Sequence, residues 1–169
     1  MVDYAKLIAD LKLVKLLKKS HGRDDIPGSD IDKLAAMVND AADIAGPLLE
    51  RIPQTFKQYT DHNIGHCHNL IDLMGRFIPR KTLDNLNGLE LAMLILSALL
   101  HDFGMFVTEQ EKREALASKG YESFLASHHD RANAIREARE RGDHDRAQVI
   151  EDALLAEYFR RMHPERARV

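Results

Sequence analysis

Four side chains of this sequence are of the types that bind metal ions and transfer protons. His62 and His66 stand four residues apart, and the dipeptide His101-Asp102 ends an apolar run further along the chain. Imidazole and carboxylate groups are ligands of divalent cations, and an all-helical protein assembles them from separate parts of its chain. The spacing therefore predicts a metal site built where two helices meet.

The His-Asp dipeptide alone says little, because the chain also contains His129-Asp130 and His144-Asp145. Those two dipeptides lie in charged segments and are expected at the surface. His101-Asp102 differs because an apolar segment forces it to the edge of the core, where an ionised carboxylate is costly unless a cation or hydrogen bonds compensate. This context favours His101-Asp102 as part of the site.

His62 and His66 support the same site if one helix includes both. Residues four apart project from one face of a helix, so the two imidazoles could bind or flank a single ion. His68 would then point away from them. Cys67 lies about 100° from His66 around a helix, which predicts a buried free thiol rather than a ligand.

Apolar residues recur at spacings of three and four, which predicts an all-α fold without strands. The expected helices cover about residues 4–17, 31–44, 63–77, 89–100 and 145–163, with Asp61 as a candidate cap before the third. Gly46-Pro47 is expected to end the second helix, and Pro79 the third. The helix over 89–100 is the most apolar and is expected to be the most buried.

The character of the sequence changes after Gly104. Thr108 and Glu111 form a capping-box pattern, and charged helical segments follow. We expect residues 105–145 to form an exposed helical insertion or lid within a single domain spanning residues 1–169.

Composition narrows the function classes. The chain has 169 residues, one cysteine and a formal net charge of -3, which does not indicate nucleic-acid binding. A single cysteine excludes a disulfide scaffold and fits a reducing, cytoplasmic setting. The sequence shows no signal peptide, and we expect no membrane span and no membrane partner.

The candidate site resembles that of the HD superfamily of metal-dependent phosphohydrolases. The matching positions are His66, followed four residues later by apolar Leu70, and the run His101-Asp102-Phe103-Gly104. The resemblance covers about residues 55–105 well and implies an HD-domain-like helical bundle. It also implies that His66, His101 and Asp102 bind metal.

A second resemblance concerns the residues around His62. The segment Tyr59-Thr60-Asp61-His62-Asn63, with His66 three residues later, is similar to one in cyclic nucleotide phosphodiesterases. There the earlier histidine is the general acid for the leaving group, and by resemblance that role falls on His62.

The last stretch, residues 159–166, is similar to an Arg-x-x-His-x-x-Arg segment in HD-type domains of large multidomain proteins, often joined to a GHKL-type ATPase module. By this resemblance His163 serves a second metal or the substrate phosphate, and a C-terminal ATPase module is expected in the full chain. Arg160, Arg161 and Arg166 could clamp a phosphate through bidentate hydrogen bonds.

The sequence departs from the family in two places. Family members close the site with a downstream aspartate, which here is Asp130, Asp152 or a residue beyond 169; we favour the last, which makes this chain an N-terminal fragment. Met105 stands where several HD phosphodiesterases have a lysine, which leaves the substrate class open.

The expected function is hydrolysis of a phosphate ester or anhydride, with a nucleotide as the expected substrate. Water activated by one or two divalent ions would attack phosphorus, and Asp102 could bridge two ions. Mn, Fe or Mg is favoured, with Zn or Ni as alternatives. Two other hypotheses are a catalytically silent HD-like regulatory or nucleotide-binding domain, and a helix bundle that the histidines merely support.

Overall fold

A computed structural model describes residues 2–21, 26–56 and 62–166 of the chain, and every regular element within them is helical. The prediction of an all-α fold is therefore confirmed. The elements are α1 (Tyr4–Ile8), α2 (Lys12–Lys18), α3 (Gly28–Leu49), α4 (Ile52–Thr55), α5 (Ile64–Phe77), α6 (Arg80–Asn85), α7 (Gly88–Leu100), the 3-10 helix η1 (Phe103–Met105), α8 (Glu109–Leu116), α9 (Lys119–Ala126), α10 (His129–Glu140) and α11 (His144–Arg166).

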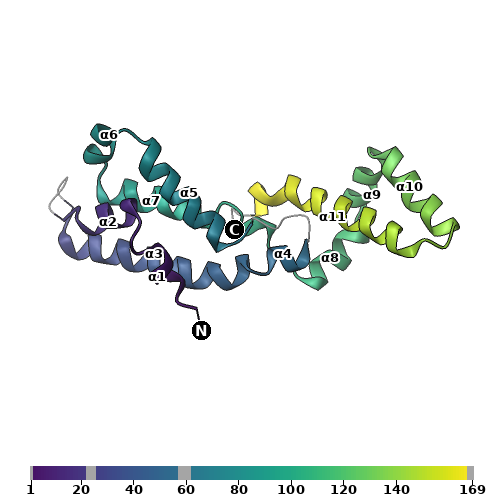
Figure 1. The fold of residues 1–169 in the computed structure, drawn as a ribbon, viewed down its shortest axis with the longest axis horizontal. Coiled ribbons are helices and arrows are strands. Elements are labelled where there is room, and N and C mark those ends of the chain that lie inside the picture. The colour runs from purple at the N-terminus through teal and green to yellow at the C-terminus, as the bar shows by residue number, and fades with distance from the viewer. Residues whose placement is uncertain (1, 22–25, 57–61, 167–169) are drawn as a thin grey trace.

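Helix α7 lies at the centre of the first half of the molecule, in contact with α2, α3 and α5 (Figure 1). Its start is fixed by a capping box, in which the Asn87 side chain accepts from the Glu90 amide and the Glu90 carboxylate accepts from the Asn87 amide. Leu91, Ile95 and Leu99 are fully buried against the neighbouring helices. The most apolar segment of the sequence is thus a core helix, as expected.

The segment Gly88–Met105 is long and apolar enough, by length and composition alone, to cross a membrane. This finding qualifies the expectation that the sequence contains no membrane span. Half of the segment is buried inside the protein. The α-helix itself ends at Leu100, and its contacts with α2, α3 and α5 account for its apolar side chains.

Helix α3 continues through Gly46-Pro47, so the expectation that this pair ends the helix is wrong. Pro47 lies in the last turn, where only one intrahelical hydrogen bond is lost. Gly46 is required by packing, because a Cβ there would lie 2.4 Å from Cγ of the Tyr4 ring. A contact between distant segments, and not a helix break, explains the glycine.

The single helix expected over residues 4–17 is two helices, because Leu11 adopts an extended conformation. Asp3 caps α1 by accepting from the Lys6 amide, whereas no side chain caps α2. The break directs α1 onto α3 and α2 onto α7. Ile8 and Leu13 are both fully buried as a result.

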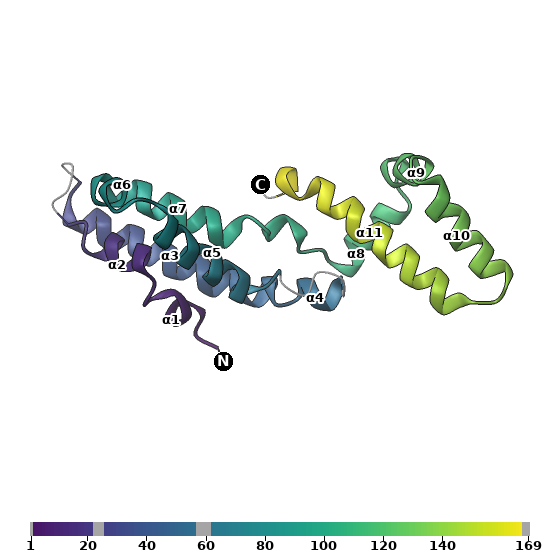
Figure 2. The same cartoon turned by 45° about the horizontal axis from the view of Figure 1, so that its top comes forward.

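Helices α9 and α10 lie at the opposite end of the elongated molecule, α8 leads to them from near the middle, and α11 runs from that end back toward the middle (Figures 1 and 2). Helix α11 packs along α10 and reaches η1, the turn that follows α7. The capping box of Thr108 and Glu111 is present as predicted. The expected last helix extends past His163-Pro164 to Arg166.

The buried hydroxyl of Tyr121 in α9 is expected to lower the stability of this second group of helices. Its side chain is buried between the rings of Phe124 and Tyr158, and its hydroxyl has no hydrogen-bond partner within the described part of the chain. A buried hydroxyl without a partner costs about 1–3 kcal/mol. We expect Tyr121→Phe to raise the free energy of unfolding by ~1 kcal/mol, measured by urea denaturation at neutral pH.

The same substitution should change the behaviour of the protein at high pH. Burial, with the negative charges of Glu151 and Asp152, raises the pKa of Tyr121 to about 12, against about 10 in an unfolded chain. The folded state therefore holds this proton more tightly, and stability falls as pH rises from about 10 to about 12. Tyr121→Phe should remove this part of the alkaline loss. A variant less stable than wild type at neutral pH would show that the hydroxyl is satisfied.

Candidate metal centre

The predicted ligands meet where α5 begins and α7 ends. His66 lies in the first turn of α5, while His101 caps the C-terminus of α7 and Asp102 follows it. The two helices run in opposite directions and pack against each other, because only α6 and two short turns connect them. This arrangement brings residues about 35 positions apart in sequence into one cluster.

Helix α5 begins one residue later than expected, and His62 is not part of it. Asn63 is the cap, with its side chain accepting from the His66 amide at 3.1 Å. The condition under which one helical face would carry both histidines is therefore not met. The expected cap Asp61, with Tyr59 and Thr60, lies outside the described residues. His62 still approaches His66, with 5.7 Å between the ring centroids.

Three ligand atoms converge on one point. Nε2 of His66 lies 3.2 Å from Nε2 of His101, and Oδ2 of Asp102 lies 2.9 Å from the His101 nitrogen and 3.8 Å from the His66 nitrogen. Donor atoms bound to one ion at about 2.0–2.2 Å stand about 3 Å apart. These separations fit a single divalent ion, and His66, His101 and Asp102 form the one such group within the described residues.

Asp102 is the most buried member of the cluster, with 4% of its surface exposed. The side chains of His62, His66 and His101 are about one third exposed. The carboxylate therefore lies at the bottom of the site and the imidazoles form its rim. A buried carboxylate at the base of an open ring of nitrogens suits a cation that remains accessible to a substrate.

Groups behind the ligands fix their orientation. Nδ1 of His101 donates to the Ala98 carbonyl at 3.0 Å, which directs Nε2 into the cluster. The Cys67 thiol is buried and donates to the Leu99 carbonyl at 3.7 Å. The expectation that Cys67 is a buried free thiol is confirmed. Both contacts satisfy carbonyls at the end of α7 that the helix leaves without amide partners.

His101 and Asp102 shift each other's pKa values in opposite directions. The hydrogen bond that His101 donates to Asp102, followed by its hydrogen bond with Cys67, raises the pKa of His101 to about 10, although burial opposes the shift. Burial alone would raise the pKa of Asp102, but hydrogen bonds and positive charge from His101 and His62 lower it to about 2. Without metal, a proton on His101 balances the carboxylate, and a bound cation would replace that proton.

His62 makes the shortest contact of the cluster. Its Nδ1 lies 2.7 Å from Oδ2 of Asp102, the oxygen that also faces His101 and His66. The carboxylate therefore orients the His62 ring as well as serving as a ligand. His62 and Asp102, the two catalytic residues expected from the sequence, are therefore joined by a hydrogen bond in one group.

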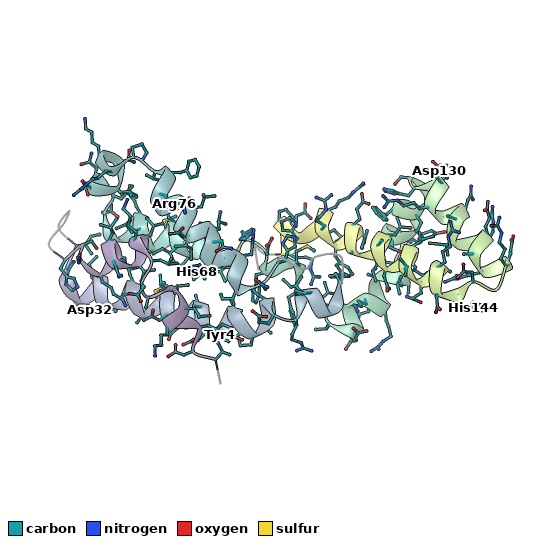
Figure 3. All side chains as sticks on the ribbon, in the orientation of Figure 1. Tyr4, Asp32, His68, Arg76, Asp130 and His144 are labelled. Atoms are coloured by element: carbon teal, nitrogen blue, oxygen red, sulfur yellow. The ribbon has the colours of Figure 1, made fainter. Side chains whose placement is uncertain are left out.

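The remaining predicted residues lie outside this group of ligand atoms. His163 lies near the end of α11, with Nδ1 donating to the Arg160 carbonyl, and its role toward a second metal stays a prediction. Asp130 is exposed in the first turn of α10, at the far end of the molecule from His68 (Figure 3). Asp152 is exposed on α11 and accepts from Gln148.

Of the three arginines expected to clamp a phosphate, Arg160 and Arg161 are exposed. Arg166 is engaged with the protein itself: it donates to the carbonyls of Gly104 and Phe106 and to the Glu111 carboxylate, each at 2.9 Å. Residue spacing gave no sign of these contacts, which join positions 55 to 62 residues apart.

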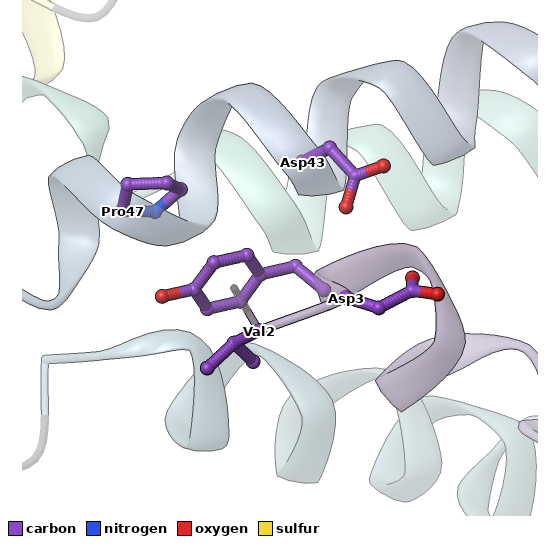
Figure 4. A pocket seen from close by; sticks show the side chains of 5 residues that line it. Val2, Asp3, Asp43 and Pro47 are labelled. Carbon is purple, nitrogen blue, oxygen red and sulfur yellow. The ribbon is translucent and has the colours of Figure 1, made fainter.

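Two hollows on the first half of the molecule differ in their relation to the cluster. One, of about 310 Å³, begins at His66 and follows α5 over Asn69, Leu70, Asp72, Leu73 and Arg76. The other, of about 330 Å³, lies between α1 and α3 (Figure 4). In the second hollow the carboxylates of Asp3 and Asp43 accept from backbone amides of α1, which gives them a structural role.

Comparisons with known proteins agree with this geometry. The model of the HD-CE family matches residues 56–169, a range that contains all four residues of the hydrogen-bonded group. Searches of curated proteins and of solved structures found no significant match. With this match and its His-His-Asp cluster, the chain belongs to the HD-CE family and carries an HD-like helical domain.

Proposed function

We propose that this chain is a metal-dependent phosphohydrolase that acts on a phosphate ester or anhydride of a nucleotide. The observation that carries the proposal is the convergence of His66, His101 and Asp102 within bonding range of a single ion, with His62 hydrogen-bonded to the same carboxylate. The family match supports an HD-like domain at this position.

His66, His101 and Asp102 would hold a divalent cation, with Mn, Fe or Mg favoured and Zn or Ni as alternatives. Such a cation supplies positive charge for the phosphoryl oxygens and lowers the pKa of water toward neutrality. The chain's part is to keep the ligand atoms in place: Ala98 fixes the ring of His101, and Asp102 binds through a buried carboxylate.

His62 would act on the leaving group. Asp102 holds Nδ1 of His62, so the proton that this ring delivers to a departing oxygen is the one on Nε2. The same hydrogen bond limits rotation of the His62 ring, as a carboxylate does for the histidine of a hydrolase triad.

The hollow along α5 favours a nucleotide over inorganic phosphate. Leu70 and Leu73 offer apolar surface for a base, while Asn69 and Arg76 offer polar groups at its edges. His66 belongs both to this hollow and to the metal cluster. A nucleoside placed there would have its phosphate beside the metal ligands.

We also propose that this HD-like domain works together with a GHKL-type ATPase module, as the resemblance of residues 159–166 implies.

The test is a screen of nucleoside mono-, di- and triphosphates and cyclic nucleotides with Mn²⁺, Fe²⁺, Mg²⁺, Zn²⁺ and Ni²⁺ in turn. We expect hydrolysis of at least one nucleotide with at least one metal, and none by Asp102→Ala. Binding of a nucleotide without turnover under every metal would overturn hydrolysis and identify a silent binding domain.

A further inference from the structure

We propose that Arg166 is a positioning residue for the metal centre: its guanidinium ties the end of α11 to the turn after Asp102 and so holds Asp102 and His101 against His66. The inference rests on the proposed function only in that it assumes a metal centre. It gives Arg166 a role in the fold of the site, and not in contact with substrate.

The turn after the ligands has little stability of its own. Asp102 is followed by η1, a single 3-10 turn of three residues closed by the Met105 amide donating to the Asp102 carbonyl at 2.8 Å. So short a helix has few internal hydrogen bonds and depends on contacts from elsewhere. Any movement of this turn would displace Asp102 directly.

Arg166 supplies such contacts. Its Nε donates to the Gly104 carbonyl, and one terminal nitrogen donates to the Phe106 carbonyl, both at 2.9 Å. The same nitrogen pairs with Glu111, whose carboxylate also completes the cap of α8. The planar fork of arginine can satisfy acceptors at fixed separation, which an ammonium group cannot do.

Packing of the backbone shows that α11 and the turn fit closely. A Cβ at Gly104 would lie 2.1 Å from the His163 carbonyl oxygen, so only glycine allows the helix to approach. The atom that a Cβ would meet belongs to the backbone of α11, so no side-chain movement could relieve the clash. Arg166 follows His163 by three residues and closes the contact from the next turn.

Helix α11 also contacts the end of α4 through Phe159. The Arg166 guanidinium lies over the Phe159 ring, 5.3 Å from its centroid, and Phe159 packs against Phe56 with 5.9 Å between centroids. Phe56 precedes the segment that leads to His62. Helix α11 therefore contacts both Phe56 and the turn after Asp102.

The chain offers a matched control on the same helix. Arg161 lies over the Phe124 ring at 5.0 Å and pairs with Glu157 at 2.8 Å, much as Arg166 does with Phe159 and Glu111. No hydrogen bond joins Arg161 to η1 among the described residues. Comparing Arg166→Met with Arg161→Met thus isolates the two carbonyl contacts.

The experiment measures two properties of the full chain. In the metal-free protein, we measure the rate of hydrogen exchange at the backbone amides of Met105 and Phe106. In titrations with Co²⁺ alone, visible absorption reports affinity and coordination. We expect Arg166→Met to speed exchange at both amides and to weaken Co²⁺ binding by about 10- to 100-fold with an altered spectrum, the range for loss of a group that orients ligands. Arg161→Met should match wild type in both.

Arg166→Lys keeps the charge opposite Glu111 without the fork, and it should show the same effects if Arg166→Met does not fold. Equal behaviour of the Arg166 and Arg161 variants in exchange and Co²⁺ affinity would overturn the inference. A raised KM for nucleotide with unchanged exchange and Co²⁺ affinity would assign Arg166 to the phosphate instead. If wild type takes up no Co²⁺, the proposed metal function fails, and exchange alone decides whether Arg166 fixes the turn.

Discussion

Asp102→Ala is expected to abolish both metal binding and hydrolysis. The substitution removes the carboxylate of the three-ligand group and leaves two imidazoles, which hold a hard divalent ion poorly. It also removes the acceptor for His62, so the proton donor loses its orientation. We expect Mn²⁺ affinity to fall by more than about 100-fold, above the 10- to 100-fold typical of outer residues, and turnover to fall to background.

The measurement is metal content of the purified protein, followed by titration with Mn²⁺ and assay of the active nucleotide. Asp145→Ala is the matched control, because Asp145 also follows a histidine but is exposed. It should bind metal and turn over like wild type. Metal bound equally by Asp102→Ala and wild type would show that the ion, if one binds, lies elsewhere.

Folding stability adds a second readout. Asp102 pairs with His62 at 2.7 Å and with His101 at 2.9 Å, and its removal leaves both imidazoles without their buried partner. Removing one member of such a group is more harmful than replacing all members by apolar residues. Asp102→Ala should therefore have a lower free energy of unfolding than wild type even without metal. A second variant, in which apolar residues replace both His66 and Asp102, tests whether the cluster is purely structural. If it is, this double variant should be as stable as wild type.

The elements that carry the site could be predicted from the sequence. Helix α7 was expected over 89–100 and spans Gly88–Leu100, and α5 was expected over 63–77 and spans Ile64–Phe77. Both have apolar periodicity and clear local ends, at Asn87 and Pro79 among others. The prediction that His66, His101 and Asp102 come together is confirmed. It could be made from the sequence because two antiparallel helices that are adjacent in the chain have few other ways to pack.

The sequence did not reveal what depends on contacts between distant segments. Gly46-Pro47 was expected to break a helix, yet the Tyr4 ring explains the glycine. Asp61 was the expected cap of α5, but Asn63 is the cap because its side chain accepts from the His66 amide. Arg166 was expected as one member of a phosphate clamp, and nothing in the sequence indicated its hydrogen bonds to carbonyls of the turn after Asp102. Spacing along one chain contains none of this information.

His62→Asn is expected to separate proton transfer from metal binding. The side-chain amide of asparagine can replace Nδ1 of His62 as the donor to Asp102, so the ligand group should survive. It cannot act as an acid near neutral pH. Loss of a general acid lowers turnover by about 10²- to 10⁴-fold, and we expect kcat for the nucleotide to fall within this range while Mn²⁺ affinity changes by less than about 10-fold.

The nature of the leaving group makes this prediction specific. Hydrolysis of a 4-nitrophenyl phosphate ester releases 4-nitrophenolate, a stable anion that needs no proton as it leaves. His62→Asn should therefore hydrolyse such an ester at close to the wild-type rate. His68→Asn is the control, because His68 lies outside the metal cluster and contacts Asn69. Equal losses on the nucleotide and the nitrophenyl ester would contradict a proton-donor role and indicate that His62 acts only by orienting Asp102.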